Sequence, residues 1–159
     1  SLQVIFNVFR QKLVTELLPQ AEEKGVGIVV RLPLASGLLT GKFTKQTTFP
    51  DNDHRNYNKN GEAFNVGETF AGLPFEKGID FVNSIKKDIL PDDLTMVQLA
   101  LRWILDHKAV SCIIPGASSP KQVIGNAAVS DLKVLSSETH NALAELYKTQ
   151  VHQAIRGAY

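Results

Sequence analysis

The chain has 159 residues, of which 43% are hydrophobic and 21% charged, enough for one domain with its own core and ordinary for a soluble globular protein. The net charge of +1, with Lys and Arg scattered along the chain, argues against a nucleic-acid surface. A single cysteine rules out a disulfide within the chain, and we find no leader peptide and no apolar run near 18 residues, so we expect a cytoplasmic protein with no membrane partner.

Two β-rich segments and one helix open the chain. Residues 2–7 predict a strand, and residues 13–24 predict a helix that has its apolar side chains on one side and ends at Gly25. Residues 27–31 form a continuous apolar run, which is typical of a parallel strand buried on both faces. The run ends on Arg31, and a charge at the end of a buried strand needs a partner.

A long polar stretch follows the second strand. Residues 32–42 are rich in Leu and Gly, and residues 43–74 are irregular, with five Asn, two Pro and three Gly. A connection of that length in a compact domain is typical of a lid, a binding loop or a disordered segment. We interpret residues 43–74 as a long lid-like loop.

Helices dominate the rest of the chain. Residues 75–89 carry apolar side chains at helical spacing, and Thr95 with Gln98 forms a capping box that opens a second, largely buried helix. The lone Cys112 lies in an apolar run, and we expect it to be a small buried hydrophobe. The remaining elements are a strand over residues 111–115 and helices over residues 120–129 and 137–151.

The order β-α-β-loop-α-α-β-α-α predicts an α/β fold with three parallel strands and flanking helices. No repeat, low-complexity tract or linker divides the chain, so we expect a single domain over residues 1–159. Ligand sites in such folds lie at the carboxyl ends of the strands. Two glycine-rich segments, residues 33–42 and 115–126, come directly after strands and should therefore meet on one face.

The second of these segments has the pattern of an anion site. A Pro-Gly turn leads into a helix that starts on Ser119, with Pro120 at its first position. Free backbone N–H groups, a hydroxyl cap and the positive end of a helix dipole then lie together, and such a place binds phosphate. Gln122 and Asn126 follow on one helix face. The pattern predicts a nucleotide pocket, and the alternative is a capped helix with no ligand.

Four segments together resemble the aldo-keto reductase family. They are residues 2–10 (LQVIFNVFR), 33–42 (PLASGLLTGK), 98–103 (QLALRW) and 113–122 (IIPGASSPKQ). Members of this family have a (β/α)8 TIM-barrel fold. They are oxidoreductases that move hydride between NADP(H) and a carbonyl. The resemblance implies that the three strands are barrel strands six, seven and eight, so that the chain is an incomplete TIM-barrel segment completed by association.

The resemblance also implies a cofactor site. Gln3 matches the amide that holds the nicotinamide carboxamide, and Arg31 stands where many members stack a Tyr on the nicotinamide ring. Gly125 stands where many relatives carry Glu. The loop along the pyrophosphate corresponds to Pro33, Leu34, Ser36, Gly37, Leu38 and Lys42, the adenosine and 2′-phosphate pocket to Gly116, Ala117, Ser118, Ser119, Gln122 and Asn126, and the lid over the substrate to Phe49, Arg55 and Tyr57.

The catalytic part of the family pattern is missing. Its Tyr proton donor and the assisting Lys, Asp and His lie on the first four barrel strands, which this chain lacks. Tyr57, Tyr147 and Tyr159 do not match the catalytic motif, so we assign no catalytic residue. The four histidines share no metal-ligand spacing, and we expect no metal.

Two functions remain open at this point. The first is the cofactor-binding C-terminal segment of an NADP(H)-dependent reductase, inactive alone. The alternative is a non-catalytic, self-associating module from a truncated gene, with a binding or assembly role.

Three parallel strands cannot close a barrel, so strand edges and barrel-facing side chains should be uncovered. We expect Val4, Phe6, Val30 and Ile114, or the residues alternating with them, to form this apolar patch. The predicted partner is therefore a second copy of the chain, in a homo-oligomer, or a missing N-terminal half-barrel.

Overall fold

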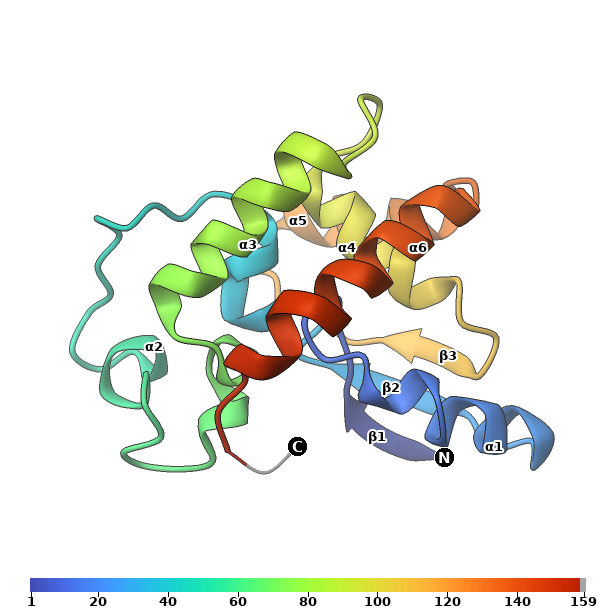
Figure 1. Ribbon diagram of the computed structural model, residues 1–159, viewed down its shortest axis with the longest axis horizontal. Coiled ribbons are helices and arrows are strands. Elements are labelled where there is room, and N and C mark those ends of the chain that lie inside the picture. The colour runs from blue at the N-terminus through green and yellow to red at the C-terminus, as the bar shows by residue number, and fades with distance from the viewer. Residues whose placement is uncertain (158–159) are drawn as a thin grey trace.

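The fold is built around one three-stranded parallel sheet, in a computed structural model that describes residues 1–157. The strands are β1 (Leu2–Ile5), β2 (Ile28–Arg31) and β3 (Val110–Ile113), and they lie side by side in this order (Figure 1). Both pairings are parallel. The prediction of an α/β fold with three parallel strands and flanking helices is thus confirmed.

The helices follow the predicted order, with one addition inside the long loop. The first, α1, begins at Leu17 and not at residue 13, because Pro19 has no N–H for the carbonyl of Thr15 and cannot stand inside a longer helix. Gly25, at φ +64°, follows its end as predicted. The bounds are α1 (Leu17–Glu23), α2 (His54–Tyr57), α3 (Phe75–Asp88), α4 (Met96–Leu105), α5 (Pro120–Ala127) and α6 (Ser137–Leu146).

The core lies between one face of the sheet and the helices. Phe6, Ile28 and Val30 are fully buried there. The ring of Phe6 packs against Trp103 of α4, with 4.9 Å between the ring centroids. The capping box of Thr95 and Gln98 that opens α4 is present as predicted. The most apolar helix of the chain is therefore held against the sheet.

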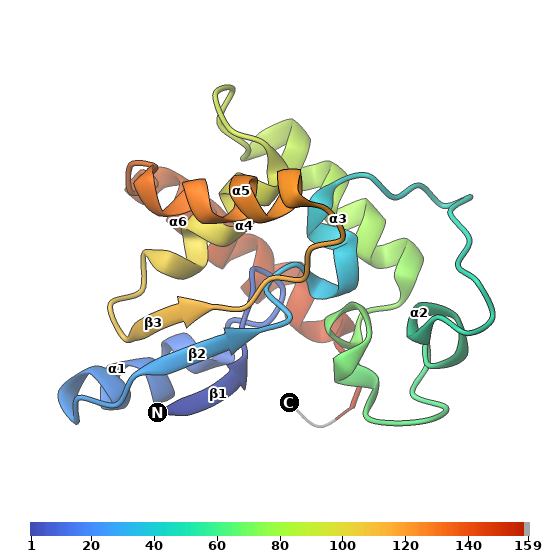
Figure 2. The ribbon, with the colours of Figure 1, turned by 180° about the vertical axis from the view of Figure 1, so that it is seen from behind.

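The other face of the sheet is open, and Figure 2 shows the three strands with no helix in front of them. The side chains on this face belong to the residues that alternate with Phe6 and Val30 along the strands. They include the exposed Gln3 and the half-buried Arg31. Of the two alternating sets that the sequence left open, the one with Val4, Phe6 and Val30 therefore lies on the covered face, whereas Ile114 is 50% exposed. The hydrophobic side chains went to the helices because those offer the only large apolar surface within the described chain.

Cys112 is exposed, so the expectation of a buried thiol is wrong. Cys112 pairs with Val29 after a register shift between β2 and β3, and its side chain therefore lies on the open face. Gly27 accommodates this irregularity, since a Cβ there would lie 2.5 Å from the Ser111 hydroxyl. An apolar run alone does not say whether both faces of a strand are covered.

The long loop over residues 43–74 is partly ordered. It contains α2 and two 3-10 turns, Val66–Glu68 and Phe70–Gly72. The side-chain amide of Asn58 donates to the hydroxyl of Thr69 at 3.0 Å, and both residues are fully buried. Residues 43–53 form an arm that leaves the body of the fold and returns at α2 (Figure 1). The second half of the loop is therefore an integral part of the domain.

Candidate functional site

The two glycine-rich segments meet in one groove with a volume of about 500 Å³, at the carboxyl ends of β2 and β3. The segment after β2 supplies one wall and α5 the other, while the start of α4 closes the groove. The lining residues are Leu34, Thr40, Lys42, Thr95, Val97, Gln98, Gly116, Ser119, Lys121, Gln122, Gly125 and Asn126. The structure therefore brings together the segments that the sequence predicted to be neighbours.

The start of α5 has the predicted capped geometry. The Ser119 hydroxyl accepts the backbone N–H of Gln122 at 3.3 Å, and Pro120 occupies the first helical position. The side-chain carbonyl of Gln122 folds back to accept the backbone N–H of Ser118 at 2.6 Å and its hydroxyl at 3.1 Å. These bonds fix the turn, so that the positive end of the helix dipole faces the groove.

The charge and shape of the groove suit an anionic ligand. Lys42 and Lys121 line it, and no carboxylate occurs among its lining residues. A Cβ placed on Gly116 or Gly125 would meet nothing within 4 Å, so both glycines open onto free space. A ligand phosphate would find two ammonium groups here and would be able to approach the backbone closely.

The segment after β2 reaches this geometry through a strained backbone. Leu32, Ala35 and Ser36 have φ between 48° and 54°, the left-handed region that costs a residue with a side chain about 1 kcal/mol or more. Phe70 and Ala71 in the long loop share this conformation. The two strained stretches are bonded to each other, so each stabilises the other.

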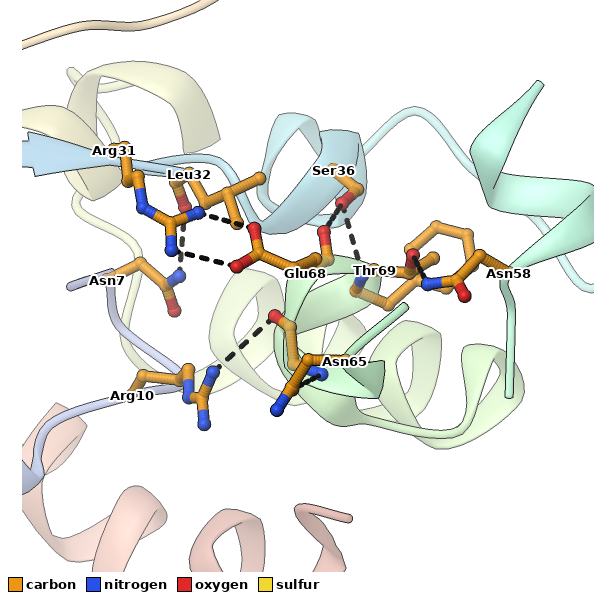
Figure 3. A network of polar contacts seen from close by, with 11 residues as sticks. Asn7, Arg10, Arg31, Leu32, Ser36, Asn58, Asn65, Glu68 and Thr69 are labelled. Carbon is orange, nitrogen blue, oxygen red and sulfur yellow. Dashed lines mark hydrogen bonds and ion pairs between the residues drawn. The ribbon is translucent and has the colours of Figure 1, made fainter. Parts of the chain in front are cut away.

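Ser36 makes that connection. Its hydroxyl donates to the carbonyl of Glu68 at 3.2 Å and accepts the backbone N–H of Phe70 at 3.1 Å (Figure 3). Ser36 thus joins the groove segment to the long loop and does not face the groove. Two other predicted contacts, Pro33 and Leu38, are buried and shape the segment from beneath.

Arg31 has the partner that its position at the strand end demanded. Its guanidinium forms a bidentate ion pair with Glu68, in which Nη2 donates to Oε1 at 2.8 Å and Nη1 donates to Oε2 (Figure 3). The hydrogen bond from Arg31 holds the pKa of the Glu68 carboxyl below its ordinary value. Glu68 is therefore ionised near neutral pH and is unsuited to act as a general acid.

The sequence did not point to Glu68. A carboxylate in a polar loop carries no local signal, and it lies 37 positions from Arg31. The need of Arg31 for a partner was the only indication. The same holds for Asn7, whose side chain is fully buried and donates to the carbonyl of Leu32 at 2.9 Å.

The predicted lid residues separate into two groups. Phe49 and Arg55 lie together, with the guanidinium 4.5 Å from the ring centroid. Arg55 also binds Asp53 and lowers the pKa of that carboxyl to about 2. Tyr57 is 46% exposed and meets Phe64 instead. The ring of Phe43 contacts Gly37, since a Cβ placed on Gly37 would lie 2.8 Å from Cζ of that ring. The lid arm therefore packs against the groove segment.

The remaining predicted positions lie beside the groove. Gln3 is on the open face of the sheet, on the side that carries Arg31. Ala117 lines a neighbouring cavity of about 350 Å³ between β3 and α5, together with Cys112 and Val123. The adenosine end of the predicted site is thus a groove, whereas its nicotinamide end is a half-site on an open sheet.

The groove lining contains no tyrosine from residues 1–157. Tyr57 lies away from the groove, Tyr147 lies in a late helical turn, and Tyr159 falls outside residues 1–157. No group of three His, Cys, Asp or Glu side chains in that range could hold a metal ion. Within the same residues, no helix has the length and apolar character needed to cross a membrane.

These features define a class of protein: a parallel α/β segment with a groove that carries two lysines at the carboxyl ends of its strands. The comparisons with known proteins agree. The model of the "Aldo/keto reductase family" matches residues 1–148. The chain therefore belongs to the aldo-keto reductase family.

The matches to individual relatives extend over most of this chain. They span less than half of the length of each relative. A probable voltage-gated potassium channel subunit beta of Oryza sativa is 30% identical over 80% of this chain and 37% of its own. Aldo-keto reductase YhdN of Bacillus subtilis is 28% identical over 77% of this chain and 35% of its own. The solved glycerol dehydrogenase AKR11B4 of Gluconobacter oxydans superposes with a TM-score of 0.75 at 26% identity, over 99% of this chain and 45% of that one.

Proposed function

We propose that this chain is the cofactor-binding part of an NADP(H)-dependent oxidoreductase that reduces a carbonyl compound or oxidises the corresponding alcohol. One observation carries the proposal, which is the groove of about 500 Å³ between the two glycine-rich segments, with its two lysines. NADP(H) supplies the hydride when bound.

The groove suits the adenosine phosphate end of the cofactor. Lys42 and Lys121 would neutralise phosphate charge, the N-terminus of α5 would donate backbone N–H groups, and Asn126 would face the base. A groove with two ammonium groups and no lining carboxylate favours a ligand with an extra 2′-phosphate over one without it. The charge of the groove therefore suits NADP(H) better than NAD(H).

The nicotinamide end would lie on the open face of the sheet. Gln3 offers an amide to the carboxamide, and the planar guanidinium of Arg31 offers a face for stacking. The Glu68 carboxyl there is ionised and does not offer a proton to a carbonyl oxygen. Carbonyl reduction would therefore require an N-terminal half-barrel that covers the open face, and we expect the chain alone to be inactive.

The same open face supports a second candidate function, a self-associating, non-catalytic module. Ile114, which follows β3, is 50% exposed on this face, and Leu2, Val123 and Ile124 are further apolar side chains, 45% to 70% exposed, elsewhere on the surface. Apolar side chains beside two unpaired strand edges favour association. Light scattering at micromolar concentration tests this: an oligomer is expected, and a well-folded monomer would contradict self-association.

A fluorescence titration with NADPH tests the cofactor proposal. Lys121→Ala should weaken NADPH binding by about tenfold and change NADH binding much less, because the lost charge faces the 2′-phosphate. Lys133→Ala is the matched control, since Lys133 is exposed and lies outside the groove. Saturating NADPH that produces neither a fluorescence change nor a thermal shift would refute the proposed function.

A further inference from the structure

The Arg31–Glu68 pair stands where the proposed function places the nicotinamide ring, and both partners are held in place by their backbones. Arg31 ends β2, and the carbonyl of the next residue, Leu32, accepts the side-chain amide of Asn7 at 2.9 Å. Asn7 in turn accepts the backbone N–H of Phe9 at 2.9 Å. The Cα position of Arg31 is therefore fixed by a fully buried amide.

Glu68 is fixed from both sides. Its own carbonyl accepts the Ser36 hydroxyl at 3.2 Å, and the preceding carbonyl, of Gly67, receives Nη1 of Arg10 at 3.5 Å. Gly67 is buried, and a Cβ there would lie 2.4 Å from Nη1 of Arg10, so a larger residue would displace the guanidinium. The following residue, Thr69, is fully buried. Figure 3 shows these backbone contacts on either side of the Glu68 side chain.

The pair is therefore more than a mobile surface salt bridge. Both side chains are about one-third exposed, and the two parallel N–H···O contacts orient the guanidinium plane. The left-handed residues Leu32, Ala35 and Ser36 on one side and Phe70 and Ala71 on the other belong to the same junction. Such strain persists where the surrounding structure holds a defined geometry.

Charge gives this geometry a function. The oxidised nicotinamide ring is cationic, whereas the reduced ring is neutral. An uncompensated guanidinium beside the ring would oppose the oxidised form, and a carboxylate paired with it removes that repulsion.

We propose that Glu68 is a positioning residue that orients the Arg31 guanidinium and neutralises it, and thereby sets the relative affinity of the site for oxidised and reduced cofactor. This inference rests on the proposed cofactor function. It assigns to the second half of the long loop a role in cofactor selection, in addition to covering a substrate.

Calorimetric titration of the 159-residue chain with NADP⁺ and with NADPH tests the proposal. Glu68→Gln keeps the size of the side chain and removes its charge. The ratio of the dissociation constant for NADP⁺ to that for NADPH should rise by about tenfold, because Arg31 is then uncompensated. Arg31→Gln should lower the ratio, because it removes the cation beside the ring and leaves the Glu68 carboxylate without its ion-pair partner.

The double variant, Arg31→Gln with Glu68→Gln, should return the ratio close to that of the original chain. Glu62→Gln serves as a control, since it is an exposed carboxylate of the same loop that bonds Asn60. If Glu68→Gln does not fold, the downward shift in Arg31→Gln and its cancellation in the double variant still decide the matter.

The possible failures are distinct. If the original chain binds neither cofactor, the proposed function falls and this inference falls with it. If the original chain binds both and the ratio is unchanged in Glu68→Gln, or if both forms weaken equally, Glu68 is merely structural and only this inference is overturned.

Discussion

Asp106 connects three parts of the fold, and its removal should destabilise the chain strongly. Its Oδ1 accepts Nε of Arg102 at 2.7 Å, and its Oδ2 accepts the backbone N–H of Leu135 at 3.0 Å. The same Oδ2 lies 2.8 Å from Nε2 of His140 on α6. The Asp106 side chain is 3% exposed and that of Arg102 is 10% exposed, so the pair is buried.

Asp106→Ala leaves the buried guanidinium without its carboxylate and the Leu135 N–H without an acceptor. Breaking a buried ion pair by removing one partner costs about 3–5 kcal/mol. A domain of this kind has a total stability of about 5–15 kcal/mol, so the variant should be near the limit of folding.

Urea unfolding followed by the fluorescence of Trp103 measures the loss, because this single, buried tryptophan is next to Arg102. Asp88→Ala is the control, since Asp88 is 61% exposed and 3.9 Å from its lysine, and it should change stability by less than about 0.5 kcal/mol. Adding Arg102→Met to Asp106→Ala should recover part of the stability by removing the unpaired charge. Equal stability of Asp106→Ala and Asp88→Ala would refute the reasoning.

Two further predictions concern glycine and histidine. Gly125→Ala should stabilise the chain by about 1 kcal/mol, because the new Cβ lies in a helix and meets nothing within 4 Å. Gly78→Ala should destabilise it, since a Cβ there lies 2.5 Å from Leu38; thermal melts of the two variants should shift in opposite directions. Burial lowers the pKa of His107 in the folded state below 6.5, so the unfolded chain binds more protons and stability should fall as the pH drops through and below 6.5. In His107→Phe the slope of stability against pH between 7 and 5.5 should be smaller, and identical slopes would contradict this prediction.

Much of the fold was accessible from local patterns. The capping box at Thr95, the cap at Ser119 and the glycine stop at Gly25 each depend on a few neighbouring residues, and each is present. Two predictions from the sequence were wrong, and the residues responsible are also local. Pro19 delayed the start of α1, and the apolar run around Cys112 did not reveal that one face of β3 is open.

The groove was predictable in outline only. Two glycine-rich segments after parallel strands had to meet at one edge of the sheet, and they line one groove. Their detailed roles were less accessible. Ser36 and Leu38 belong to the sequence pattern, but Ser36 bonds the long loop and Leu38 packs against Gly78 of α3.

The sequence by itself determined the order of the strands and of the longer helices and several of their ends, because caps, turns and helical periodicity depend on residues within a turn or two of one another. Tertiary structure alone decided which carboxylate neutralises Arg31, which side chains line the groove and which face of the sheet stays open. Those outcomes depend on contacts between residues far apart in sequence, such as Arg31 and Glu68, 37 positions apart. Such a pair has no local signal, because its geometry exists only after the long loop has folded back against the strand ends.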